Sequence, residues 1–141
     1  MTTTNPTFGT RELYDALAEV LNSDEAWLDK AKNMTFSMTH VYNGDPAGVF
    51  RMHFARGVMS DVAEYADQGA APDSEFVLSG AVDDWRRMLV TGELSANIAL
   101  VSRKLKVKGK MGALMKNIPQ FNYIISKLIE LEPRVAADSP A

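Results

Sequence analysis

The chain has 141 residues, of which 46% are hydrophobic and 23% are charged, and this composition suits one folded domain with a core of its own. The absence of cysteine excludes disulfides, thiolate metal ligands and a cysteine nucleophile. The net charge of −3 hides an asymmetry, because the stretch from Leu94 to Ile129 contains no Asp or Glu and seven Lys or Arg residues. Such a one-sided basic region favours an anionic partner.

The two ends of the sequence predict no targeting segment. Residues 1–9 are polar and lack the basic and apolar parts of a secretory signal, and the last residues match no peroxisomal signal. No apolar run approaches the roughly 20 residues that a membrane-spanning helix needs. We therefore expect a cytoplasmic protein with a disordered tail over residues 1–9, a single domain over residues 10–132 and a flexible tail over residues 133–141.

The first part of the domain predicts two helices. Leu13, Leu17 and Leu21 recur at helical spacing after Thr10, a residue type that caps helices. Asn22 followed by Glu25 resembles a second cap, and an apolar face continues from there to about residue 32.

Alternation of apolar and polar residues then predicts strands. Residues 35–42 and 50–55 both alternate, and the Asn43-Gly44 pair between them favours a hairpin because both residues tolerate positive φ. Residues 58–66 and 75–80 are expected to form a third and a fourth strand.

The last part mixes helices with one strand. A helix opens at Asp83 or Asp84 and ends at Gly92, and a short helix follows over 94–103. Lysines alternate with apolar residues in the strand 104–110, and helices follow over 111–118 and from Pro119 to Pro133. This order predicts an α+β fold with a mostly antiparallel sheet that helices cover on one face.

The polar residues do not assemble into a recognisable catalytic or metal site. His40 and His53 are expected in adjacent strands but on opposite faces, and adding Asp61 still matches no metal-binding motif. Asp83 and Asp84 are neighbours on a helix, so they point about 100° apart and are better suited to the helix N-terminus than to acid–base catalysis. We expect no enzyme, no metal and no cofactor.

The lysine-rich strand can be a solvated edge of the sheet, and it also allows two functional interpretations. Gly109-Lys-Met-Gly112 has the Gly-x-x-Gly form of K-homology RNA binders, but there the loop joins two helices, whereas here it follows a strand. We expect no nucleic-acid binding. Weak contact with an anionic membrane is the other interpretation, at about 1 kcal/mol per base. It would use Lys104, Lys106, Lys108 and Lys110.

The last helix is apolar on more than one side. Ile124, Ile125, Leu128, Ile129 and Leu131 cover more than a single stripe. A helix of this kind must bury two faces, so it is expected to lie between the sheet and a ligand, or beneath a partner chain. Methionines in the same part of the chain suit an adaptable apolar surface.

Several short runs stand out between Phe76 and Lys116: Asp83-Asp84-Trp85, Met88-Leu89, Gly92-Glu-Leu-Ser95, Leu114-Met115-Lys116 and above all Lys104-Leu-Lys-Val-Lys-Gly-Lys-Met-Gly112. In these runs the stretch resembles the sterol carrier protein type 2-like family. It implies a five-stranded sheet, helices on one side, and an apolar tunnel that holds a sterol, a fatty acid or a fatty acyl-CoA without catalysis. The peroxisomal signal of some members is missing.

The expected tunnel lies between the sheet and the C-terminal helices. Burying a lipid chain gains about 0.8 kcal/mol per CH₂, so an apolar wall alone suffices for binding. Pro119 is the expected hinge for entry. The expected lining residues are Phe36, Met38, Phe50, Met52, Trp85, Met88, Leu89, Met111, Leu114, Met115, Ile118, Phe121, Ile124, Ile125 and Leu128.

Alternatives to a lipid carrier stay open from the sequence. The same fold with a closed cavity would be an interaction module, with its last helix packed on a second protomer in a homodimer. An enzyme, or an accessory domain of an enzyme system, would act on lipophilic substrates through His40, His53 or Asp61.

Overall fold

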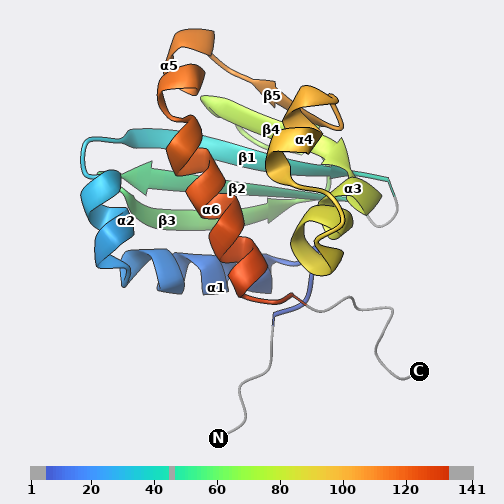
Figure 1. Cartoon of the computed structure of the whole chain (residues 1–141), viewed down its shortest axis with the longest axis horizontal. Coiled ribbons are helices and arrows are strands. Elements are labelled where there is room, and N and C mark those ends of the chain that lie inside the picture. The colour runs from blue at the N-terminus through green and yellow to red at the C-terminus, as the bar shows by residue number, and fades with distance from the viewer. Residues whose placement is uncertain (1–5, 45–46, 134–141) are drawn as a thin grey trace, which may run out of the picture.

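The computed structural model describes residues 6–44 and 47–133, and within them five strands form one sheet (Figure 1). The strand order is β3–β2–β1–β4–β5. The strands are β1 (Thr35–Asn43), β2 (Gly48–Ala55), β3 (Val58–Tyr65), β4 (Phe76–Ala81) and β5 (Leu105–Lys108). In this part of the chain three neighbouring pairs are antiparallel and β1–β4 is parallel, so the sheet is mixed and the expected α+β fold is confirmed.

The parallel pair follows from a crossover behind the sheet. Residues 66–75, which include the short helix η1 (Gln68–Ala70), carry the chain from the edge strand β3 to β4. Thr39 Oγ1 lies 2.6 Å from Ser74 Oγ, and the Arg51 guanidinium donates to the carbonyl of Asp73 at 3.0 Å. Thr39 and Arg51 alternate with inward-facing residues, so the crossover runs over the face that points away from the helices.

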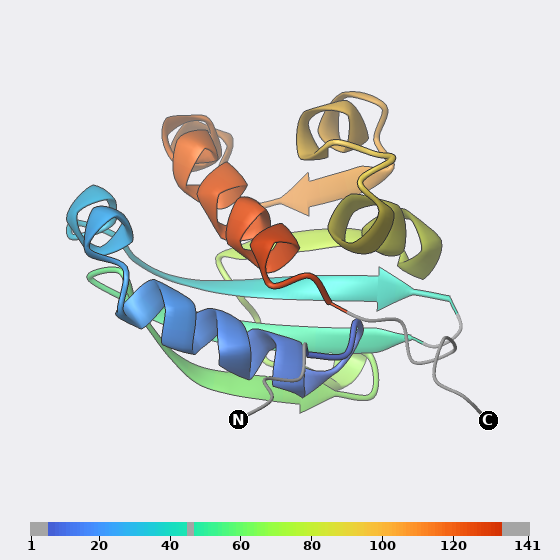
Figure 2. The same ribbon diagram turned by 60° about the horizontal axis from the view of Figure 1, so that its bottom comes forward.

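The α-helices lie together on the other face of the sheet (Figure 2). Before the β5 strand these are α1 (Arg11–Asn22), α2 (Glu25–Lys30), α3 (Val82–Arg86) with its continuation η2 (Arg87–Thr91), and α4 (Ala96–Val101). After β5 come α5 (Met111–Lys116) and α6 (Ile118–Glu130). Gly92 ends η2 with a left-handed φ of 73°, as predicted, and Pro119 lies in the first turn of α6, also as predicted.

The predicted cap at Asn22 is wrong. Asp24 is the residue that caps α2, and its carboxylate accepts the backbone N–H of Trp27 at 3.2 Å. Asn22 is instead the last residue of α1, and its amide bonds both to the N–H of Met59 at 2.8 Å and to the carbonyl of Met59 at 2.9 Å. Its side chain therefore fixes α1 to strand β3.

Aromatic rings between the sheet and the helices form much of the core. The rings of Phe36 and Phe54 stack at 4.8 Å on neighbouring strands, and Phe121 of α6 meets Phe76 of β4 edge-on at 5.0 Å. These contacts seat α6 on the centre of the sheet.

Both ends of the described chain pack on the domain. Pro6 and Pro133 are buried, and the ring of Phe8 lies 5.4 Å from that of Tyr42. The rest of the two expected tails, residues 1–5 and 134–141, lies outside the described residues.

Candidate functional site

An apolar cavity of about 540 Å³ lies between α4 and α6, above strands β4 and β5. We call it the α4–α6 cavity. Its volume falls within the range of roughly 300–1,000 Å³ that is usual for small-molecule sites. It is lined by Leu78, Leu100, Val101, Arg103, Leu105, Lys106, Val107, Met115, Ile118, Phe121, Asn122 and Ile125.

The floor of the cavity comes from the edge of the sheet. In β5 the side chains alternate, so Leu105 and Val107 face the helices in alternation with Lys106 and Lys108. Val107 pairs with Leu78 of β4, which adds a second row of apolar side chains to the floor. The strand that carries the lysine stripe therefore also carries part of the cavity wall.

One wall of the cavity is a single face of α6. Ile118, Phe121 and Ile125 follow one another at three- and four-residue spacing and all line the cavity. Ile124 and Leu128 point elsewhere and are buried in the core. Phe121 and Ile125 are buried as well, so one side of α6 packs into the core and also borders the cavity, whereas Ile129 is 41% exposed.

The mouth of the cavity is open and partly apolar. Val101 of α4 is 83% exposed and Met115 of α5 is 63% exposed, although both line the cavity. Arg103 and Lys106, two of the polar residues in the lining, are also exposed. The lining is therefore mostly apolar, and its polar residues include two exposed bases.

Four of the fifteen lining residues expected from the sequence border the cavity: Met115, Ile118, Phe121 and Ile125. The side chains of Met111 and Leu114 lie outside the part of the chain that the structure describes. The others are buried core residues of the strands and helices: Phe36, Met38, Phe50, Met52, Trp85, Met88, Leu89, Ile124 and Leu128. Which of these residues meet a ligand stays a prediction.

None of the cavity-lining residues of β4, β5 and α4 was among the fifteen expected from the sequence. Leu105 and Val107 had a clear signal, because they alternate with the lysines. Leu100 and Val101 had none, since a six-residue helix is too short to show an apolar stripe.

The two histidines lie apart from the cavity lining. His40 is buried, with its Nδ1 2.9 Å from the Tyr14 hydroxyl, and burial lowers its pKa to about 3. The Tyr14 hydroxyl also lies 2.7 Å from that of Tyr42, and burial raises the pKa of both tyrosines. His53 pairs with Ser37 across β1–β2, so it lies on the opposite face, as predicted.

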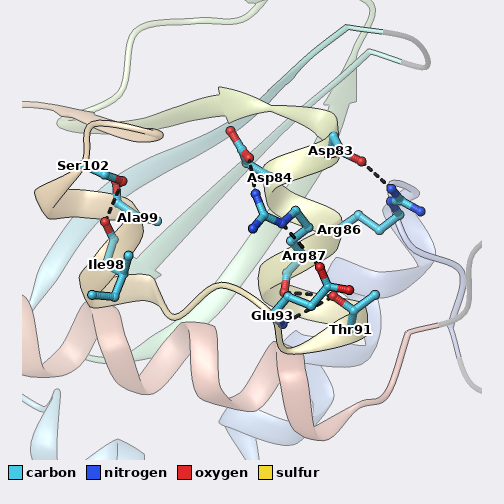
Figure 3. A network of polar contacts seen from close by, with 9 residues as sticks. All are labelled: Asp83, Asp84, Arg86, Arg87, Thr91, Glu93, Ile98, Ala99 and Ser102. Carbon is cyan, nitrogen blue, oxygen red and sulfur yellow. Dashed lines mark hydrogen bonds and ion pairs between the residues drawn. The ribbon is translucent and has the colours of Figure 1, made fainter.

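The adjacent acids of α3 are used in ion pairs. Asp83 pairs with Arg86, and Asp84 lies 3.5 Å from Arg87, which also approaches Glu93 at 3.6 Å (Figure 3). These pairs hold α3, η2 and the segment before α4 together. Among the described residues, no group of three or more His, Cys, Asp or Glu could hold a metal ion.

The four lysines considered for membrane contact lie in different parts of the fold. Lys106 lines the α4–α6 cavity, and Lys104 lies between two residues that line it. Lys108 instead lines a groove of about 360 Å³ with Thr39 on the far face of the sheet. Lys110 lies in the turn between β5 and α5. In the two described ranges, no helix is long and apolar enough to cross a bilayer.

The fold is a small α+β domain in which a sheet and a layer of helices border an apolar cavity. The chain belongs to the SCP-2 sterol transfer family, whose sequence model matches residues 17–122. Domains of this family are in general non-catalytic and bind or transfer lipids. A search of curated proteins found no match.

Solved structures share the fold at low identity. A crystal structure of sterol carrier protein 2 has a TM-score of 0.76 and 19% identity, covering 87% of this chain and 98% of that one. A Thermus thermophilus protein, described as possibly a sterol carrier protein, has a TM-score of 0.76 and 18% identity, covering 99% and 96%. The ubiquinone synthesis protein UbiJ-SCP2 has a TM-score of 0.54 and 15% identity, covering 81% and 90%.

Proposed function

We propose that the protein binds and transfers a lipid with a long hydrocarbon body and an anionic head, such as a fatty acid or a fatty acyl-CoA. The observation that carries this proposal is the α4–α6 cavity, which is apolar inside and has Arg103 and Lys106 among its exposed lining residues. The hydrocarbon chain lies along Leu105, Val107 and α6, and the head group stays in water beside the two bases.

The apolar interior supplies the binding free energy. About ten buried methylenes contribute ~8 kcal/mol, from which the cost of association is subtracted. The bases add selectivity, because a carboxylate or phosphate at the rim is attracted to them and the hydroxyl of a sterol carries no charge. We therefore rank anionic lipids above sterols as the ligand.

Displacement of a fluorescent fatty acid tests the proposal. Palmitate and palmitoyl-CoA should displace the probe at lower concentration than cholesterol does. Replacing Arg103 and Lys106 with Gln should remove most of this preference and leave cholesterol binding unchanged. If palmitate and cholesterol bind equally well to the wild type, the assignment of an anionic head is wrong.

A pair of matched tryptophan variants tests the place of binding. Val107 in β5 and Val62 in β3 are both half-buried and lie on opposite edge strands, but only Val107 lines the cavity. Val107→Trp fills the cavity and should weaken probe binding at least tenfold, whereas Val62→Trp should bind like the wild type. Equal binding by both variants, with both folded by circular dichroism, would place the ligand elsewhere.

The same binding experiment, together with sedimentation, also tests the interaction module as an alternative function. A wild-type protein that binds no probe but sediments as a dimer would support the closed-cavity interaction module. The role as an accessory domain of an enzyme system and the cytoplasmic location stay predictions.

A further inference from the structure

A second cavity lies on the other side of α6 from the α4–α6 cavity. It has a volume of about 450 Å³, and its lining comes from the α2–β1 turn, the starts of β1 and β4, and the α5–α6 junction. We call it the α2–α6 cavity. In the ribbon view α6 lies between α2 and α4, so the two cavities flank this helix (Figure 1).

The α5–α6 junction is the wall that the two cavities share. Residues that are close neighbours in the sequence line opposite sides of it. Those on the side of the α4–α6 cavity are Met115, Ile118 and Phe121, and those on the side of the α2–α6 cavity are Lys116, Asn117 and Gln120. The two cavities are therefore separated by the width of one helical segment.

The ring of Phe121 closes this wall next to the sheet. Phe121 is 6% exposed and lines the α4–α6 cavity. Its ring centroid lies 5.9 Å from that of Phe36 and 5.0 Å from that of Phe76, and both contacts are edge-on. Phe36 and Phe76 line the α2–α6 cavity. One aromatic ring thus borders the first cavity and packs against the lining of the second.

We propose that Phe121 sets the length of hydrocarbon chain that the protein accepts, because its ring ends the α4–α6 cavity where the α2–α6 cavity begins. This inference rests on the proposed function. Each methylene that is buried before the ring raises the affinity by about fourfold. Methylenes in excess of that length stay in water outside the mouth and add nothing. Affinity therefore rises with chain length up to a limiting length and is constant beyond it.

The space behind the ring would accept a longer chain. The part of the α2–α6 cavity next to Phe121 is apolar, because it is formed by the rings of Phe36 and Phe76, and Ala113 of α5 adds an apolar side chain to the same lining. Lys30 and Lys116 line the cavity as well but are exposed, so they lie toward water. A smaller side chain in place of Phe121 would therefore join the two cavities into a longer apolar path.

Displacement of a fluorescent fatty acid by saturated fatty acids of increasing length tests the role of Phe121. The series is decanoate, laurate, myristate, palmitate, stearate and arachidate. For the wild type, each step of two methylenes should raise the affinity by up to about fifteenfold until the limiting length is reached. Phe121→Ala should move the limiting length to a later member of the series. Phe121→Val removes less of the core and should move it in the same direction, so the test does not depend on the folding of the alanine variant.

Phe54 provides the matched control. Its side chain is fully buried and its ring stacks on that of Phe36 at 4.8 Å, so it belongs to the same group of aromatic rings as Phe121. Phe54 lines neither cavity, so Phe54→Ala and Phe54→Val should keep the limiting length of the wild type. A second control adds Ala113→Phe to Phe121→Ala. The new ring fills the α2–α6 cavity and should restore the limiting length of the wild type.

The outcomes distinguish this inference from the proposed function. An unchanged limiting length in both Phe121 variants, or an equal shift in the Phe54 variants, would overturn the role of Phe121 while lipid binding stands. A limiting length that stays long after Ala113→Phe is added would also overturn it. A wild-type protein that binds no member of the series would refute the proposed function, and this inference with it.

Discussion

The buried His40 should make the protein lose stability in mild acid. In the folded chain its pKa lies at about 3, below its ordinary value of 6.5, because burial disfavours the charged imidazolium. In the unfolded chain the same side chain takes up a proton as the pH falls below 6.5. The unfolded state then binds more protons than the folded state, so the free energy of unfolding falls as the pH falls from 6.5 to 3.

The size of the effect follows from the pKa difference. Each unit of pKa is worth about 1.4 kcal/mol, so full protonation of the unfolded state costs ~5 kcal/mol of stability by pH 3. Between pH 7.5 and pH 5, above the range in which most carboxylates titrate, His40 should account for about 2 kcal/mol. The rest of the loss falls at lower pH, where carboxylates such as Asp24, whose pKa is lowered mainly by its hydrogen bond from Tyr123, add their own contribution.

Urea unfolding at pH 7.5, 6 and 5, followed by the fluorescence of the two tryptophans, measures this loss. His40→Phe should cost about 1 kcal/mol at pH 7.5, since Tyr14 loses a hydrogen-bond partner, and should flatten the pH dependence. His53→Gln, on the opposite face of the sheet, is the control and should keep the wild-type dependence. The reasoning is refuted if His40→Phe loses stability between pH 7.5 and 5 as steeply as the wild type does.

Two pairs of single variants give further predictions about packing. Leu128→Ala should lower the free energy of unfolding in urea by about 2–5 kcal/mol, because the Leu128 side chain is fully buried. Ile129 is 41% exposed, so Ile129→Ala should lower it by well under half as much. Equal losses would mean that α6 is rotated. Gly109→Ala should lower the melting temperature strongly, because a Cβ there would lie 2.7 Å from the carbonyl oxygen of Glu75 at a φ of 155°. Gly112→Ala meets no atom within 4 Å and should melt like the wild type or higher; a reversed order would show that the Gly-x-x-Gly loop has another conformation.

The sequence predicted the strands well because their signals are local. The Asn43-Gly44 turn and the alternation on both sides of it specify the β1–β2 hairpin within a few residues. The parallel pairing of β1 with β4 carries no local signal, since the loop 66–75 could return the chain to either edge of the sheet. The Asn22 cap failed for a related reason: the amide of Asn22 found backbone partners 37 residues away at Met59.

The candidate site was harder to predict than the fold. Ile124 and Ile125 are adjacent and chemically identical, and both are buried in the core, yet only Ile125 also lines the cavity. Their hydrophobicity predicts that both side chains are buried, but it does not show whether a buried side chain contacts only other side chains or borders a cavity. The rim needed tertiary structure too, because Val101 and Met115 come from separate helices on either side of β5.

The two hydrogen bonds between Asn22 and Met59 also bear on edge-to-edge pairing between copies of the protein. β3 is an edge strand, and the N–H and C=O groups on the outer side of an edge strand can pair with a strand of another molecule. The carboxamide of Asn22 occupies one N–H and one carbonyl on that edge, as the peptide group of an added strand would. The opposite edge, β5, is only four residues long and carries lysines. Edge-to-edge pairing of two molecules is therefore disfavoured at Met59 on one edge, where Asn22 already holds the backbone groups, and along β5 on the other, where the lysines repel each other.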